Sequence, residues 1–254
     1  YDPTRPDVTG TYSYWDDHID FVIDKAAELG LYIALLPAWG DKFNIMWGKG
    51  PEIFTGENAL VYGRWLGERY KDRSNIIWVL GGDRPLENEH HAGIIRGMAE
   101  GLLSAHGGRQ LISFHPPGNR TSSQFVHEER WLSFHMVQSG HNHKEVYNYK
   151  LIESDYALEP VRPVMEAEPC YEEHKRSAQL EDGFYTDYEV RRAAYWGLFA
   201  GGFGHTYGHH AVWSMTTEPT PSIRVDWKEG IESRGSAVMQ HVRRLMESRP
   251  FLAR

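Results

Sequence analysis

The sequence predicts an α/β fold in which parallel strands alternate with helices, most simply an incomplete (β/α)8 TIM barrel of about six strand–helix units. Apolar runs of strand length and amphipathic segments of helix length alternate along all 254 residues. The first recognisable element, at 14–30, is a helix that no strand precedes. We therefore expect the first two barrel strands to be missing. A doubly wound sheet is the alternative, but no glycine-rich phosphate loop follows an early strand.

The helices are predicted from apolar residues that recur at steps of three and four. In the segment 14–30, Trp15, Ile19 and Ala26 fall on one face, and Gly30 supplies a stop. The same periodicity predicts the other helices, at 58–73, 91–107, 144–158, 187–201 and 231–248.

The strands are predicted from apolar runs that end at polar residues. Residues 76–81 are apolar or glycine at every position, which indicates a strand buried on both faces. The segment 31–41 is predicted to be a buried strand followed by a loop that carries Trp39 and Asp41. The remaining strands are predicted at 110–118, 131–141 and 162–172, and the segment 202–214 is predicted to be a strand with its loop.

Composition narrows the classes of function. The length fits a single domain over 1–254 of barrel size. A formal net charge of -8 without a basic stripe argues against a nucleic-acid partner. The single cysteine, Cys170, excludes an internal disulfide framework and a multi-cysteine metal site. No run of ~18 apolar residues occurs, so no membrane partner is expected.

The residues at the predicted strand ends are polar, acidic and aromatic. In a βα barrel the carboxyl ends of the strands and the loops after them form the active face. The residues at these positions are Trp39, Gly40, Asp41, Asp83, Arg84, His115, Gln138, Ser139, His141, Glu166, Glu168, His205, Tyr207, His209 and His210. So many ionisable groups in one ring indicate an active or binding site.

Two carboxylates in this ring suit glycoside hydrolysis. Asp83 follows the fourth barrel strand and Glu168 the seventh, when two missing strands are counted. Both strands project toward one cavity, and a retaining glycosidase needs two carboxyl groups about 5 to 5.5 Å apart. Gly81 and Gly82 are expected to turn the backbone before Asp83. The alternative is structural: Asp83 pairs with Arg84 or caps the following helix.

Glu166 competes with Glu168 for the second role. On one strand, residues two apart lie on the same face, so periodicity does not separate them. Pro169 ends the strand directly after Glu168 and places that carboxylate at the lip. We therefore prefer Glu168 as the nucleophile, and expect Glu166 to contact substrate more deeply or to support the site from behind.

The histidines raise the alternative of a metal-dependent hydrolase. The segments 141–143 and 205–210 contain several histidines, and Asp83 could complete a ligand set. The segment 127–131 is not an HExxH motif, because Trp131 stands where the second histidine belongs. Histidines at strand ends also donate hydrogen bonds to sugar hydroxyls. The sequence therefore predicts no metal and no other cofactor.

Six segments, in order along the chain, carry a family resemblance. They are "GLYIALLPAWGDK", "NIIWVLGGDRP", "FHPPG" followed by "SS", "WLSFHMVQSGH", "PVMEAEPCYE" and "RRAAYWGLFAGGFGHTYGHHAVW". Together they resemble the apiosidase-like glycoside hydrolases, glycoside hydrolase family 140. The resemblance implies a TIM barrel, often followed by a β-sandwich domain, in exported bacterial enzymes that degrade apiose-containing pectin, the rhamnogalacturonan II side chains.

In that family the catalytic aspartate corresponds to Asp83 and the catalytic glutamate to Glu168. The hypothesis is a retaining mechanism, with Asp83 as acid/base and Glu168 as nucleophile. The substrate-binding residues are expected to be Trp39, Asp41, Arg84, His115, Gln138, His141, Glu166, Tyr207 and His209, and Trp47 is a further candidate for stacking on a sugar. The alternative of another class is a barrel that binds carbohydrate without cleaving it.

Overall fold

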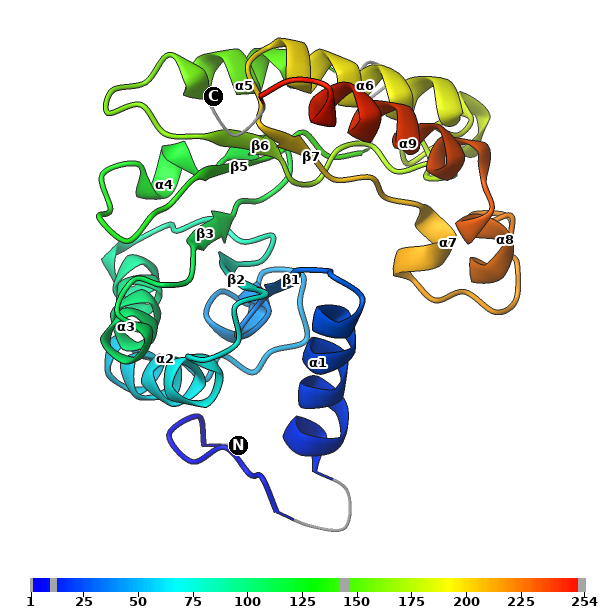
Figure 1. Cartoon of the computed structure of the whole chain (residues 1–254). Helices are drawn as coiled ribbons and strands as arrows, with labels where there is room; N and C mark the ends of the chain where they lie inside the picture. The colour runs from blue at the N-terminus through cyan, green and yellow to red at the C-terminus, as the bar shows by residue number, and fades with distance from the viewer. Residues whose placement is uncertain (1, 10–12, 142–146, 251–254) are drawn as a thin grey trace. The chain divides into compact units, whose positions relative to one another are not determined.

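The computed structural model describes residues 2–9, 13–141 and 147–250 (Figure 1). The chain forms two compact units. The first comprises Tyr1–Pro117 and Phe125–Ser133, and the second Gly118–Gln124 and Phe134–Arg254. Each unit contains its own sheet.

The first unit is built on a parallel sheet of three strands. Their order is β1-β2-β3, with β1 at Ile33–Leu35, β2 at Ile76–Gly81 and β3 at Ile112–His115. The helical elements of this unit are η1 (Tyr14–Ile19), α1 (Asp20–Glu28), η2 (Gly40–Lys42), α2 (Gly56–Tyr70) and α3 (Glu89–His106).

The core of the first unit lies around β2. Trp78 is fully buried, and its indole N–H donates to Gln110 Oε1 at 2.8 Å, so the large ring leaves no polar atom unsatisfied. Glycines bring α2 and α3 close together: a Cβ on Gly63 would lie 2.4 Å from the carbonyl oxygen of Met98. Burying these apolar faces fixes the end of β2, where Asp83 follows.

The prediction that the strand within 31–41 is buried is wrong. In β1, Ala34 is exposed and its two neighbours are only partly buried. Leu31 and Tyr32, just before the strand, are 56% and 68% exposed. The reason is its position: β1 lies at the edge of the three-stranded sheet, where β2 is its one pairing partner in the described part of the chain. Apolarity alone did not reveal which strand lies at an edge.

The second unit contains a mixed sheet of four strands in the order β4-β5-β6-β7. The strands are β4 (Arg120–Thr121), β5 (His135–Gln138), β6 (Val164–Glu166) and β7 (Gly204–His205). Strand β4 runs antiparallel to β5, whereas β5, β6 and β7 are parallel. The helical elements are α4 (Ser123–Val126), α5 (Asn148–Tyr156), η3 (Leu180–Asp182), α6 (Asp187–Phe199), α7 (His210–Trp213), α8 (Trp227–Ile231) and α9 (Arg234–Glu247).

Helices α5, α6 and α9 cover one face of this sheet (Figure 1). Val137 on β5 and Val164 on β6 pack against Ile152 of α5. A second apolar cluster joins Leu198 of α6 to Val242 of α9. These contacts hold the carboxyl ends of β5 and β6, from which the loops with His141 and Glu168 emerge.

The mixed α/β class with parallel sheets is confirmed. A strand occurs in each of the six predicted strand segments, as β1, β2, β3, β5, β6 and β7. The single-domain assignment stays a prediction. Among the described residues, none of the helices has the length and apolar content that crossing a membrane requires.

Candidate active site

Asp83 stands on an unusual turn at the end of β2. Gly81, Gly82 and Asp83 all have positive φ, at 89°, 105° and 58°. The amide of Gly82 donates to the carbonyl oxygen of His115 at 3.2 Å. The Asp83 Oδ1 atom lies 3.7 Å from His115 Nδ1. The predicted glycine turn is confirmed, and it brings the acid beside a histidine from β3. A left-handed conformation at a residue other than glycine is strained, and such residues cluster at functional sites.

Replacing Gly82 with alanine is expected to destabilise the first unit by about 1 to 3 kcal/mol. A Cβ there would lie 3.0 Å from the amide nitrogen of Gly40 and 3.0 Å from the Trp39 ring, at a φ that alanine rarely adopts. Urea unfolding measures the loss. The matched control is Gly93→Ala in α3, because a Cβ there meets nothing within 4 Å. Equal effects of the two substitutions would contradict the prediction.

Arg84 lies beneath the surface and connects the turn to the neighbouring loop. Its side chain is 1% exposed. Its Nε donates to the carbonyl oxygen of Asn44 at 3.0 Å, and its Nη1 to that of Asp83 at 3.1 Å. The guanidinium carbon lies 4.0 Å from the centre of the Trp47 ring. Arg84 therefore supports Trp47 from below, and its predicted contact with substrate stays a prediction.

Asp41 organises its own loop. Its Oδ2 accepts hydrogen bonds from the amides of Lys49 and Gly50, both at 3.1 Å, and from Lys42 Nζ at 3.3 Å. Burial by itself raises the pKa of Asp41, but the Gly50 amide, the Lys42 side chain and the Lys49 amide together hold that pKa below its usual value. The carboxylate thus fixes the loop on which Trp47 is displayed, 66% exposed.

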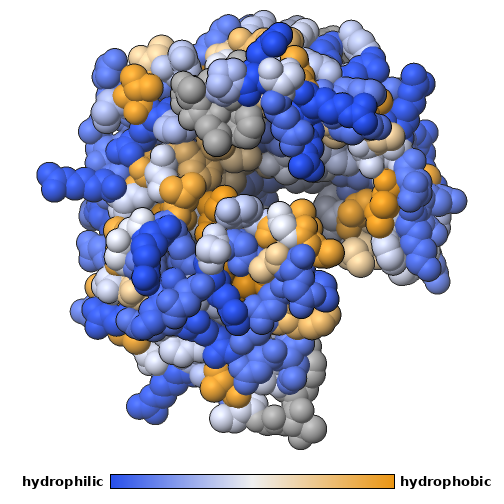
Figure 2. Space-filling model, in the orientation of Figure 1, coloured by the Kyte–Doolittle hydropathy of each residue, from blue (hydrophilic) through white to orange (hydrophobic). Residues whose placement is uncertain are grey.

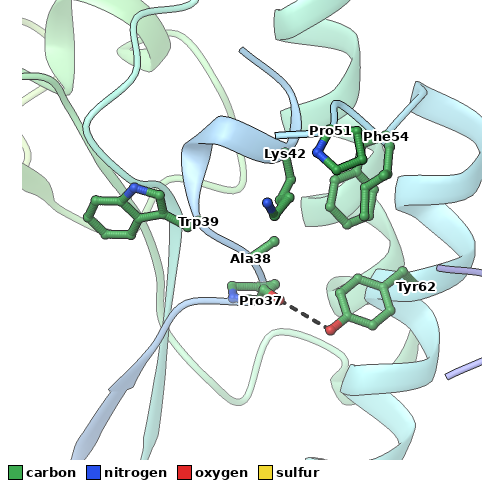
Figure 3. Close-up of a pocket in the computed structure, with 8 residues that line it drawn as sticks. Pro37, Ala38, Trp39, Lys42, Pro51, Phe54 and Tyr62 are labelled. Carbon is green, nitrogen blue, oxygen red and sulfur yellow. Dashed lines mark hydrogen bonds between the residues drawn. The ribbon is translucent and has the colours of Figure 1, made fainter. Parts of the chain in front are cut away.

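A cavity of about 280 Å³ lies in the first unit, with Trp39 on its wall (Figure 3). Figure 3 shows the hydroxyl of Tyr62 directed at the carbonyl oxygen of Pro37, to which it donates at 3.2 Å. Trp39 is 46% exposed, so a large part of its ring is open for contact. An exposed aromatic ring near the acid turn is what stacking on a sugar requires, and this predicted role of Trp39 stays a prediction.

In the second unit Glu168 is held by the loop that follows β5. The amides of Ala167 and Glu168 both donate to the carbonyl oxygen of Val137, at 2.8 and 3.2 Å. The amide of Gly140 donates to the carbonyl oxygen of Glu168 at 2.8 Å. The carboxylate Oε1 lies 3.4 Å from His141 Nε2. Two amides on one carbonyl mark a bulge, which ends the regular strand and redirects the chain before Glu168.

The assumption that Glu166 and Glu168 share one strand face is wrong. Strand β6 ends at Glu166, and the bulge breaks the period of two. Glu166 is fully buried and faces the helices: a Cβ on Gly197 of α6 would lie 3.9 Å from the Cβ of Glu166. Its Oε1 accepts a hydrogen bond from the amide of Ser139 at 3.2 Å. This placement favours the supporting role for Glu166.

Burial raises the pKa of Glu166 to about 7, despite the hydrogen bonds from Ser139 and Asn148. The folded protein therefore retains a proton that the unfolded chain loses between pH 4.5 and about 7, so stability falls as pH rises through this range. Glu166→Gln is expected to remove this fall, on the order of 3 kcal/mol between pH 4 and pH 8.

Thermal or urea unfolding of wild type and Glu166→Gln across this pH range measures the difference. Glu153→Gln is the control, because Glu153 is exposed on α5 in the same unit. A wild-type stability that runs parallel to that of Glu166→Gln from pH 4 to pH 8 would show that Glu166 does not titrate in this window.

Two further predicted residues, Gln138 and Tyr207, lie in the second unit. Gln138 ends β5 and is 5% exposed. The Tyr207 hydroxyl donates to Glu172 Oε2 at 2.6 Å and contacts Ser233 Oγ at 2.9 Å. Their contacts with sugar stay predictions, as does that of His115.

Sequence reasoning missed a row of rings beside His141. The ring centre of His141 lies 4.6 Å from that of Tyr171 and 4.3 Å from that of His174, and His174 lies 4.4 Å from His210. Burial lowers the pKa of both His174 and His210. The signal was Tyr171 and His174 shortly after "EAEP", together with His210 much later in the chain, which periodicity does not place in space.

Of the segments considered for a metal, Asn142 and His143 lie outside the described residues. In the segment 205–210, burial lowers the pKa of His205 to about 4, so its ring is neutral near pH 7. The metal-dependent hydrolase remains an alternative, and the chelator experiment described below tests it.

Comparisons with known proteins identify the family and the class of enzyme. The family model described as "Apiosidase-like, catalytic domain" matches residues 2–253. A solved structure named "Glycoside hydrolase" is 32% identical, with a TM-score of 0.85, and the match covers 98% of this chain and 58% of that one. A structure described as a glycoside hydrolase family 5 protein from Bacteroides vulgatus is 31% identical, with a TM-score of 0.87 and coverage of 99% and 57%.

A further Bacteroides vulgatus structure, described as a putative glycoside hydrolase, is 15% identical with a TM-score of 0.56 over 92% of this chain and 42% of that one, which supports the fold alone. No match was found among curated proteins. The chain thus spans somewhat more than half the length of the first two of these solved structures. It belongs to the apiosidase-like catalytic-domain family and is a glycoside hydrolase domain.

Proposed function

We propose that this domain has the (β/α)8 TIM-barrel architecture and cleaves plant cell-wall polysaccharide, in particular the apiose-containing rhamnogalacturonan II side chains of pectin. One observation supports the proposal most strongly. Asp83 lies two residues beyond the last residue of β2, and Glu168 lies two residues beyond the last residue of β6. Both acids thus follow the carboxyl ends of parallel strands, where barrel enzymes carry out their chemistry.

The proposed reaction retains the anomeric configuration. Asp83 donates its proton to the glycosidic oxygen as the bond to the anomeric carbon breaks, while a Glu168 oxygen attacks that carbon. A covalent glycosyl-enzyme forms, and the leaving sugar departs as an alcohol. Asp83, now ionised, takes a proton from water, whose oxygen displaces Glu168 and completes hydrolysis.

The neighbouring histidines suit these roles. His141 Nε2, 3.4 Å from Glu168 Oε1, orients the nucleophile when it carries the ring proton. His115, 3.7 Å from Asp83 through its Nδ1, is placed to orient the acid. Both histidines belong to the same unit as the acid that they serve.

We further propose that the protein is an exported bacterial enzyme and that a β-sandwich domain follows the barrel in the full-length protein. The family resemblance supports both proposals. The greater length of the two matched structures is compatible with a further domain.

Release of apiose and of reducing ends from purified rhamnogalacturonan II tests the function. Proton NMR of the first product shows whether the anomeric configuration is retained. Hydrolysis that survives a chelator is expected, whereas loss of activity with EDTA and its return with a divalent metal would favour the metal-dependent hydrolase. Binding of the polysaccharide without release of any sugar would favour the non-catalytic carbohydrate-binding barrel.

A further inference from the structure

A cavity of about 320 Å³ in the second unit lies where α7, α8 and the start of α9 meet. Its volume is typical of sites for small molecules. Trp213 and Ile231 on its wall are 61% and 47% exposed, so apolar surface extends outward from the cavity. Figure 2 shows hydrophobic residues at the right of the molecule, in the region where Figure 1 places α7 and α8.

His209, on the wall of this cavity, has a buried donor without an acceptor. The residue is 3% exposed, and its Nδ1 accepts a hydrogen bond from the amide of Ala211 at 3.2 Å. Burial lowers the pKa of His209 although Glu172 and Glu173 act in the opposite direction, so the neutral ring carries its proton on Nε2. This Nε2 has no hydrogen-bond partner among the described residues. A buried donor in this state is costly unless a ligand supplies an acceptor.

Tyr171 links the cavity to the proposed nucleophile. A Cβ on Gly208 would lie 2.1 Å from the Tyr171 ring, so this ring packs directly on the backbone at the cavity wall. The centre of the same ring lies 4.6 Å from that of His141, which in turn contacts Glu168. The cavity is therefore separated from Glu168 by two side chains.

The walls of the cavity are held by Glu172. This buried carboxylate accepts hydrogen bonds from the hydroxyls of Tyr207 and Ser233, at 2.6 and 2.9 Å, and from the amide of Gly235 at 3.1 Å. It thereby ties the loop after β7 to the start of α9. A site formed before the ligand arrives loses less conformational entropy on binding.

We propose that this cavity is a saccharide subsite that binds a neutral sugar ring of the polysaccharide, one or two residues along the chain from the sugar that Glu168 attacks. The exposed face of Trp213 stacks on the sugar, and His209 Nε2 donates to a hydroxyl or ring oxygen. The neutral histidine and the nearby acids, Glu172 and Glu173, favour an uncharged sugar over a uronate. The subsite rests on the proposed function, because the polymer that enters it is the substrate of Glu168.

Calorimetric titration with rhamnogalacturonan II oligosaccharides, in a Glu168→Gln background that keeps the ligand intact, tests the subsite. Trp213→Ala is expected to weaken binding about tenfold, and Trp213→Phe, which keeps an aromatic face, by less. His209→Asn is expected to weaken it about fivefold, because the asparagine oxygen still accepts the Ala211 amide while the Nε2 donor is lost. Phe199→Ala, which removes an exposed ring at the end of α6, is the control.

Weakening by both Trp213→Ala and His209→Asn, with unchanged binding by the control, supports the subsite. Unchanged affinity in both variants overturns it, and so does the absence of binding to both the oligosaccharides and a panel of D-apiose, L-rhamnose and D-galactose. Failure of the proposed function is a different result: wild type releases no sugar, yet binding still depends on Trp213 and His209. Circular dichroism melting curves confirm that each variant is folded.

Discussion

Replacing Glu168 with glutamine is expected to lower kcat for hydrolysis by about 10⁴-fold, because an amide is far too weak a nucleophile to form the glycosyl-enzyme. The measurement is the initial rate of sugar release from rhamnogalacturonan II. The fold should be preserved, since the backbone hydrogen bonds of Glu168 with Val137 and Gly140 do not involve its carboxylate. The KM should change far less than kcat.

Glu166→Gln is a demanding control for this result. It removes a carboxylate of the same type only two residues away, but one that is buried against the helices. We expect it to keep at least about a tenth of the wild-type rate, since an amide oxygen still accepts the Ser139 hydrogen bond. If Glu166→Gln were inactive and Glu168→Gln active, Glu166 would be the nucleophile and Glu168 the supporting residue.

Azide provides a second test of the nucleophile. In Glu168→Ala the small anion is expected to attack from the vacated side, restore sugar release and yield a glycosyl azide of inverted configuration. Rescue that produces no glycosyl azide would contradict direct attack by Glu168.

Asp83→Asn is expected to slow hydrolysis of the natural polysaccharide by about 10³-fold, because the leaving oxygen then departs without a proton. Asparagine tolerates positive φ, so the turn at 81–83 should be retained. An aryl glycoside with an acidic phenol needs little protonation, and its cleavage should be affected much less. The basic limb of the kcat/KM profile against pH should also disappear.

The control for Asp83 is Asp41→Asn, which changes another acid of the first unit, in η2. Its carboxylate is occupied by the amides of Lys49 and Gly50, so this substitution is expected to reduce stability while leaving the chemical step in place. Wild-type rates on the natural polysaccharide in Asp83→Asn would show that another group is the acid.

The sequence supported the order of elements and the places of the acids because these depend on local patterns. Apolar runs located the six parallel strands of the described residues, and periods of three and four indicated the helices α1, α2, α3, α5, α6 and α9. Strand β4 was missed because two residues, Arg120 and Thr121, are too short to show a period. The edge position of β1 also escaped, since a strand's neighbours in the sheet depend on contacts that are distant in sequence.

At the candidate site, too, the sequence predicted the features that depend on local patterns and missed those that depend on contacts distant in sequence. The turn before Asp83 was predictable, because consecutive glycines permit positive φ. The separation of Glu166 from Glu168 was not, because a bulge depends on hydrogen bonds to Val137, 30 residues away along the chain from Ala167. The stack of His141, His174 and His210 likewise joins two loops and the start of α7, which no sequence interval reveals.

The loop held by Asp41 has a consequence for engineering specificity. Asp41 and Lys42 form hydrogen bonds with residues 49 and 50, so the two ends of the segment 41–50 are joined to each other. Residues outside this segment hold it at Asn44, which accepts from Arg84 and donates to Pro85 and Glu87, and at Ile45, whose amide donates to Glu52. A graft of residues 41–50 from a relative should therefore keep its shape if the acid at its start is transplanted and the outside partners Glu52, Arg84 and Glu87 are kept. Exchanging this one piece would change the aromatic surface near Asp83 without rebuilding the sheet that positions the acid.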